Sequence, residues 1–376
     1  SDMSLFDVYP LFDVTLEKAK GIHVYDDNNQ QYLDLYGGHA VISIGHGHPN
    51  YINALKGQMD KIGFYSNSVQ NPVQERLAKD LIELSSCKDY QLFMCNSGAE
   101  ANENALKLAS FHTGKKKVVA FKNGFHGRTS AAVAVTDNPK IIAPINAQQD
   151  VELVELGDTK GLENILKQGD VCAVIIEFIQ GVGGLDQGTA AFFEATDTLC
   201  KTYGACLIAD EVQAGFGRSG QFFAFQNYKV TPEIISMAKG MGNGFPVGGV
   251  LIHPNIKASY GLLGTTFGGN HLACAATLAV IETLKEEKLM HHALQMETYF
   301  RNQAQNLKGL KAIKGRGLML GLEFDFPIAT LRKRLIFEHH IFTGSAKNPN
   351  VIRILPPLNI QKTHIEQLVN ALQTLL

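Results

Sequence analysis

Short, almost entirely apolar runs recur through the middle of the chain. They are residues 118–121, 172–176, 205–209 and 234–237. A strand that is apolar at every position is buried on both faces, as in a parallel sheet that helices cover on both sides. Helical apolar spacing at 73–84 and 190–202 supplies candidates for such helices. The pattern therefore predicts an α/β fold with a mostly parallel sheet.

The two ends of the chain show a different pattern of predicted helices and strands. Residues 21–25 and 31–35 predict two short strands joined by a polar turn. After Gly269 we expect three helices and a hairpin or strand, at 271–286, 289–307, 363–375 and 315–324. We therefore predict a large domain and a smaller α+β domain built from both ends of the chain. Their ranges are 46–270 for the large domain, 271–376 for the small domain, and 1–45 for the N-terminal segment that joins the small domain.

Composition and charge exclude several classes of protein. Hydrophobic residues make up 45% of the chain and charged residues 19%, as in a globular protein with a sizeable core. The net charge of −2 argues against a nucleic-acid surface, and no apolar run reaches the roughly 18 residues of a membrane helix. The six cysteines are scattered, so we expect reduced core residues and no metal site. We recognise no signal peptide and therefore expect a cytoplasmic protein.

Three of the predicted strands end in residues that carry chemistry, and an open α/β sheet binds its ligands at the carboxyl ends of strands. The first strand, 92–95, runs through Asn96 into Ser97, Gly98 and Ala99 and then a helix. Free N–H groups at such a helix start form an anion site that suits a phosphate. The alternative is a plain capped helix with Ser97 as its N-cap, and this segment alone does not decide between the two.

The other two strand ends carry an acid and a lysine. Asp210 follows the run 205–209, and an acid in a cleft needs a cationic partner, although a solvated loop acid or a metal ligand is the alternative. Lys239 follows the run 234–237 and has small residues around it. Most strand-end lysines are surface groups. A lysine in a crowded, partly dry site instead loses its proton readily and can form a Schiff base.

A phosphate cradle, a carboxylate and a nucleophilic lysine together match the needs of pyridoxal 5'-phosphate (PLP). The carboxylate keeps the pyridine nitrogen protonated, so that the ring accepts electrons. The lysine holds the aldehyde and then moves protons. A nucleotide site would instead need a glycine-rich phosphate motif in its proper context, and the chain has none.

Nearly the whole chain resembles the class III, or ω-amino-acid, aminotransferases of PLP-dependent fold type I, and most of all the acetylornithine aminotransferases. The resemblance rests on several motifs that occur in the family's order. They are GHGHP at 45–49, NSGAEANE at 96–103, FHGRT at 125–129, EFIQGVGG at 177–184, DEVQAGFG at 210–217, AKG at 238–240, GTTFGGN at 264–270 and RILPPL at 353–358.

The resemblance implies a role for each matching residue. Lys239 would carry PLP and shuttle the proton, and Asp210 would pair with the ring nitrogen. The other cofactor contacts would be Phe125 and Val212 on the two ring faces, Gln213 near the ring hydroxyl, and Ser97, Gly98 and Ala99 at the phosphate. His126 is expected to be structural. Thr266 of each subunit would reach the cofactor of the other, which implies a homodimer with the active site at the subunit interface.

The resemblance also implies the substrate contacts. Arg128 would hold the α-carboxylate, Arg353 a second carboxylate of glutamate or 2-oxoglutarate, and Thr265 would lie beside the acylornithine. Related enzymes carry a glutamate that masks this second arginine, whereas the chain has Val182 there. We therefore hypothesise that Arg353 binds an extra carboxylate on the donor, as in N-succinylornithine. His39 replaces a more usual apolar residue near the substrate mouth.

The expected activity is transfer of the δ-amino group of N-acetylornithine or N-succinylornithine to 2-oxoglutarate, in arginine biosynthesis. The products would be N-acylglutamate 5-semialdehyde and glutamate. Other ω-amine donors are alternatives, namely ornithine, 4-aminobutyrate and succinyl-diaminopimelate. A glutamate-1-semialdehyde-type aminomutase and a non-catalytic binding protein of the same fold are more distant alternatives.

Overall fold

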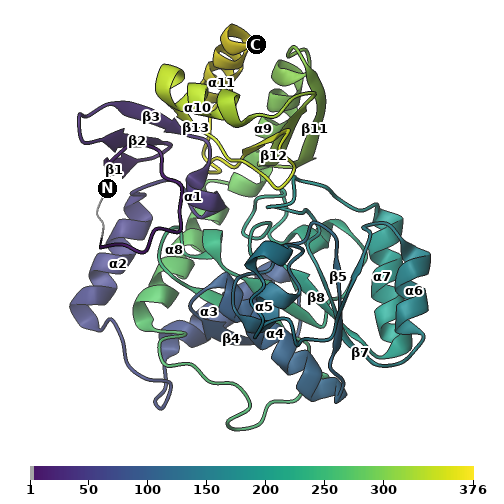
Figure 1. Cartoon of the computed structure of the whole chain (residues 1–376). Coiled ribbons are helices and arrows are strands. Elements are labelled where there is room, and N and C mark those ends of the chain that lie inside the picture. The colour runs from purple at the N-terminus through teal and green to yellow at the C-terminus, as the bar shows by residue number, and fades with distance from the viewer. Residues whose placement is uncertain (1–3) are drawn as a thin grey trace.

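The computed structural model describes residues 4–376, and a seven-stranded sheet forms its centre (Figure 1). In spatial order its strands are β4 (Gln91–Cys95), β10 (Gly248–Ile252), β9 (Ile234–Met237), β8 (Cys206–Asp210), β7 (Val171–Ile176), β5 (Lys117–Phe121) and β6 (Val151–Val154). Strand β10 runs antiparallel to both neighbours, and every other pair is parallel. The predicted α/β class with a mostly parallel sheet is confirmed.

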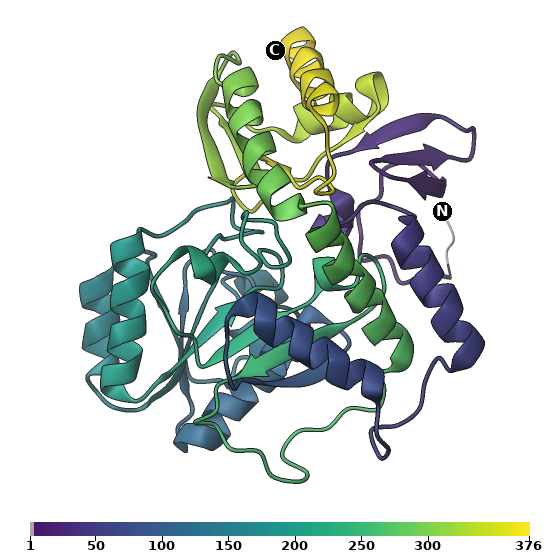
Figure 2. The same ribbon diagram turned by 180° about the vertical axis from the view of Figure 1, so that it is seen from behind.

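Helices cover both faces of this sheet, which explains why the strands are apolar at every position. In β5, Val118 and Ala120 pack in the cluster that contains α4 (Gly98–Thr113), while Val119 and Phe121 pack in the opposite cluster. Figure 2 shows the second face from behind. The other helices of this part are α2 (Pro49–Lys61), α3 (Pro72–Ser85), α5 (Ser130–Ala134), α6 (Thr159–Leu166), α7 (Ala190–Tyr203) and α8 (His271–Glu286).

The two ends of the chain meet above the central sheet (Figures 1 and 2). One small sheet has the order β1 (Leu16–Lys20), β2 (His23–Asp26), β3 (Gln31–Asp34) and β13 (Ile341–Phe342), so the last strand joins the first three. A second contains β11 (Leu310–Arg316), β12 (Met319–Phe324) and β14 (Val351–Ile354). The helices here are α1 (Gly37–Ala40), α9 (Leu289–Ala304), α10 (Ala329–His339) and α11 (Lys362–Leu375). The domain boundaries after residues 45 and 270 stay a prediction.

Some predicted elements differ in their bounds. The hairpin expected at 315–324 is the end of β11, a turn at Gly317 and Leu318, and all of β12. Gly317 has φ +61°, and a Cβ there would lie 2.1 Å from the Arg218 carbonyl oxygen, so only glycine fits this turn. The helix expected at 289–307 ends at Ala304.

All six cysteines of the chain lie within residues 4–376. All six cysteines are free and buried. No group of three or more His, Cys, Asp or Glu side chains in that range is placed to hold a metal ion. No helix in the same range is long and apolar enough to cross a bilayer.

Candidate active site

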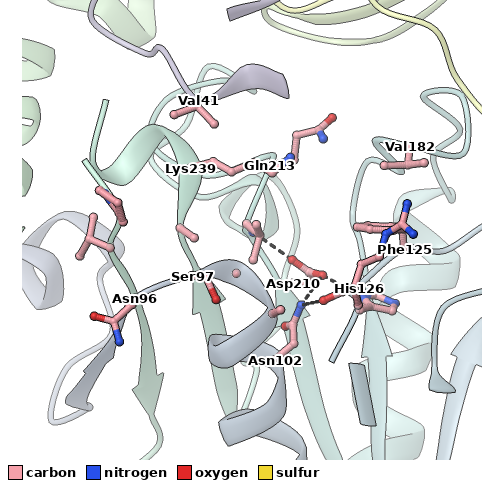
Figure 3. Close-up of a pocket in the computed structure, with 18 of the residues that line it drawn as sticks. Val41, Asn96, Ser97, Asn102, Phe125, His126, Val182, Asp210, Gln213 and Lys239 are labelled. Carbon is pink, nitrogen blue, oxygen red and sulfur yellow. Dashed lines mark hydrogen bonds and ion pairs between the residues drawn. The ribbon is translucent and has the colours of Figure 1, made fainter. Parts of the chain in front are cut away.

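A cavity of about 430 Å³ opens at the carboxyl ends of β4, β8 and β9 (Figure 3). This volume is typical of a small-molecule site. Most of the predicted site residues line it, namely Ser97, Gly98, Ala99, Phe125, Arg128, Asp210, Val212, Gln213 and Lys239. Thr265, Thr266 and Arg353 do not line it. The cavity therefore lies at the ends of the three strands that the sequence predicts to carry the site, which are residues 92–95, 205–209 and 234–237.

The start of α4 forms one wall of the cavity. Ser97 is the N-cap of this helix, because its Oγ accepts a hydrogen bond of 3.1 Å from the N–H of Glu100. The first N–H groups of a helix have no acceptor within the helix and attract anions. Gly98 packs so closely against Val212 that a Cβ added to Gly98 would lie 2.6 Å from Cγ1 of Val212. The two interpretations of this segment, a capped helix start and an anion site, are therefore compatible with each other.

Asp210 lies at the end of β8, only 4% exposed, and three donors surround it. Its Oδ2 accepts hydrogen bonds from Nδ1 of His126 at 2.7 Å and from Nδ2 of Asn102 at 3.0 Å. Its Oδ1 accepts the N–H of Val212 at 2.9 Å. Burial lowers the pKa of His126, but the hydrogen bond and the negative charge of Asp210 outweigh burial and raise that pKa overall. These donors fix the orientation of the Asp210 side chain at the floor of the cavity (Figure 3).

Lys239 follows β9 and has a left-handed backbone, with φ 52°. Such a conformation costs free energy in a residue with a side chain and is often found at functional sites. Its Nζ donates to the carbonyl oxygen of His39 at 3.1 Å. Burial and the nearby charge of Arg353 lower the pKa of Lys239 to about 8. Near pH 8 about half of the side chains are therefore neutral amines, the form that attacks a carbonyl.

Glu177 also lines the cavity. Its two oxygens accept the N–H groups of Phe125 at 2.9 Å and Gly181 at 3.0 Å, and thereby join two loops. Burial raises the pKa of Glu177 to about 7. Val182 follows in the same loop and also lines the cavity.

Arg353 lies just behind the cavity, on β14, and is 4% exposed. Its Nη1 is 3.5 Å from Oε1 of Gln213, which does line the cavity, and its Nη2 is 3.5 Å from the hydroxyl of Tyr36. Its Nε donates to the Ser345 carbonyl oxygen at 2.5 Å. Within residues 4–376, the arginines that pair with carboxylates are Arg301 and Arg334. Arg353 is therefore a buried cation whose hydrogen-bond partners within the described residues are neutral acceptors.

The family described as aminotransferase class-III matches residues 7–376, almost the full chain. The chain belongs to the class III aminotransferases. Acetylornithine aminotransferase of Bacillus subtilis is 39% identical and covers 98% of this chain and 97% of its own length. The protein of the same name from Aquifex aeolicus is 36% identical and covers 99% of both. Ornithine aminotransferase of Toxoplasma gondii has a similar structure, with a TM-score of 0.92 at 28% identity, over 99% of this chain and 92% of its own.

Class III aminotransferases depend on PLP, and a second Toxoplasma gondii ornithine aminotransferase structure is described with PLP at its active site. The cavity of this class III aminotransferase fits that cofactor. It offers an amine of lowered pKa, a buried carboxylate with fixed orientation, a helix start for a phosphate and an apolar wall from Val212. The chain is therefore a PLP-dependent transaminase.

Three contacts of this aminotransferase site were not predicted from the sequence. Asn102 lies one turn along α4 from Gly98, so helical spacing could have placed it on the cavity side. His126 was expected to be structural, and the structure places it directly against Asp210. No sequence signal links Tyr36 with Arg353, because they are 317 positions apart in the chain.

Proposed function

We propose that this aminotransferase moves the δ-amino group of an N-acylornithine to 2-oxoglutarate, as a step of arginine biosynthesis. The observation that carries the proposal is a pair of arginines at the cavity, Arg128 on its wall and Arg353 behind Gln213. Two such groups suit substrates that carry carboxylates at a distance from the reacting carbon. The names of the relatives support the same donor class.

In this proposal the cofactor residues keep the roles that the sequence implies. When bound, PLP supplies a ring that accepts electrons from the substrate carbon. Lys239 would hold the cofactor, and its Nζ would take and return the proton. Asp210 would hold a proton on the ring nitrogen. The remaining contacts would come from Phe125 and Val212 on the ring faces, Gln213 at the ring hydroxyl, and Ser97, Gly98 and Ala99 at the phosphate.

The substrate residues would act by binding and orienting. Arg128 would hold the α-carboxylate of the acylornithine as a bidentate partner. Arg353 would hold a carboxylate of 2-oxoglutarate and later of glutamate. Because Val182 carries no charge, it cannot pair with Arg353, which supports our hypothesis of an extra carboxylate on the donor.

A donor panel with 2-oxoglutarate tests the proposed reaction. We expect glutamate to form faster from N-acetylornithine or N-succinylornithine than from ornithine or 4-aminobutyrate, because Arg128 and the open cavity fit an acylated α-amino acid. Initial rates over a range of donor concentrations give kcat/KM for each. A clear preference for unmodified ornithine would instead favour the second candidate, an ornithine aminotransferase, which the structural relative from Toxoplasma gondii supports.

We further propose a homodimer in which Thr265 and Thr266 complete the partner's site. Both lie outside the cavity of their own chain, and Thr266 is exposed beside Phe267, itself 59% exposed. The rings of Phe267 and Phe64 lie 5.5 Å apart, which makes an exposed apolar surface. Exposed apolar surface of this kind marks protein interfaces.

Disrupting that surface is expected to dissociate the dimer. Phe267→Asp should convert the enzyme to monomers and lower its activity, because a charge would be buried at the interface. Sedimentation velocity measures the change. Phe111→Asp is the matched control, since Phe111 is 56% exposed on α4, away from Phe64. A Phe267→Asp enzyme that stays dimeric would rule out this interface.

A further inference from the structure

Two guanidinium groups lie against the ring of Tyr36, beyond the cavity. The Cζ of Arg353 is 5.8 Å from the ring centroid and that of Arg332 is 5.6 Å from it. Arg353 comes from β14 and Arg332 from α10, while Tyr36 directly precedes α1. The cluster therefore joins both ends of the chain at one aromatic ring.

Neither arginine forms an ion pair within residues 4–376, although the charge of the Glu177 carboxylate acts on Arg353. The Nε of Arg332 donates to the Thr343 carbonyl oxygen at 2.9 Å. Burial lowers the pKa of both guanidinium groups. Two cations that are partly removed from water and have no ion-pair partner are costly to hold together, and an anionic ligand would relieve that cost.

This cluster is connected to the reacting end of the cavity. His39 contacts the Tyr36 hydroxyl through Nδ1, and its carbonyl oxygen accepts from Lys239. Burial lowers the pKa of His39, and the charges of Lys239, Arg353 and Arg332 lower it further, so all three cations lie around one imidazole. In Figure 3, Gln213 lies on the side of the cavity where Val41 and the segment of α1 are found. A ligand that extends from Lys239 past His39 would reach the two arginines.

We propose that Arg353 and Arg332 form a carboxylate subsite around Tyr36, and that it receives the terminal carboxylate of a dicarboxylic acyl group on the amino donor. Arg332 is then a specificity-determining residue. The planar fork of arginine suits a carboxylate, and the uncharged Val182 leaves Arg353 free to share it. This inference rests on the proposed function and narrows the donor to the N-succinylornithine type.

The test compares two non-reacting ligands of the holoenzyme, N-succinylnorvaline and N-acetylnorvaline, which lack the δ-amine. Arg332→Gln should weaken binding of N-succinylnorvaline by about tenfold to a hundredfold, the effect of losing one charge-assisted hydrogen bond. Binding of N-acetylnorvaline should change less than about twofold. Titration calorimetry measures both, and kcat/KM for the two matching ornithines should change in parallel.

Two further variants separate recognition from packing, because Arg332 also lies 5.0 Å from the ring of Phe12. Arg332→Lys keeps the positive charge and should retain part of the preference for the succinyl ligand. Arg334→Gln is the matched control, since Arg334 lies on the same helix, is exposed and pairs with Glu338. It should bind both ligands like the unmodified enzyme.

Equal losses for the two ligands in Arg332→Gln would overturn the subsite, since they would indicate a packing role. Unchanged binding of both would overturn it as well. Failure of the proposed function would give a different result. Neither acylated ornithine would then be a donor for the unmodified enzyme, independently of the effect of Arg332→Gln on ligand binding. Selective weakening of N-succinylnorvaline would still support the carboxylate subsite in that case.

Discussion

Lys239→Ala is expected to lower the transamination rate by about 10⁴-fold or more, the largest effect of any single substitution in this chain. The Nζ would serve both as the covalent partner of PLP and as the group that moves the proton, so both contributions are lost together. Steady-state and single-turnover rates measure the loss. Borohydride treatment followed by mass spectrometry should find cofactor on the peptide that contains Lys239, and none in the variant.

The control for this substitution is Lys160→Ala, at an exposed lysine on α6. It should react and label like the unmodified enzyme. The Lys239→Ala protein should still fold, because the Nζ donates its described hydrogen bond to the His39 carbonyl oxygen and burial disfavours the charged amine. If the folded variant kept substantial turnover, Lys239 would not be the proton carrier.

Asp210→Asn should slow proton removal from the donor by about 10²–10³-fold, the usual cost of losing one buried electrostatic contact to the reacting system. The amide keeps the size of the carboxylate but not its charge, so the ring nitrogen would no longer be held protonated. His126 would also lose the anion that raises its pKa. Stopped-flow measurement of the first half-reaction isolates this step.

Binding of PLP should survive in Asp210→Asn, because the helix start and Lys239 are unchanged. Asp60→Asn provides the control, at an exposed acid on α2. A half-reaction rate equal to that of the unmodified enzyme would remove Asp210 from its proposed role. A variant without PLP would show that the carboxylate serves mainly to retain the cofactor.

Periodicity predicted the strands whose burial is uniform. The runs 172–176 and 205–209 match β7 and β8 almost to the residue, because both faces are covered and each position must be apolar. Strand β10 was missed, since Gly248 and Gly249 hide its pattern and it enters the sheet antiparallel. Local sequence patterns do not predict that an antiparallel strand enters the sheet at this position. Its place depends on long-range pairing with β4.

The candidate site was also predicted from the sequence only in part. Sequence motifs placed Ser97, Asp210 and Lys239 together, because each follows a strand and parallel strands end at one edge. The contact of His126 with Asp210 spans 84 positions and comes from the packing of separate loops. Arg332 was not singled out at all, since it lies in the basic run Arg332, Lys333 and Arg334 on α10, which has no local signature of a binding site.

The pairing of Leu33 with Ile341 has a consequence for how the enzyme is made. Strand β3 leaves the ribosome early, but its partner β13 is among the last segments to be synthesised. Long-range pairing of this kind closes slowly, and chains of this size fold in stages during synthesis. The central sheet can thus assemble first, while Tyr36 waits for Arg332 and Arg353. A nascent chain would pass through a stage in which the cofactor pocket exists but the second substrate carboxylate, the one proposed to bind Arg353, has no partner.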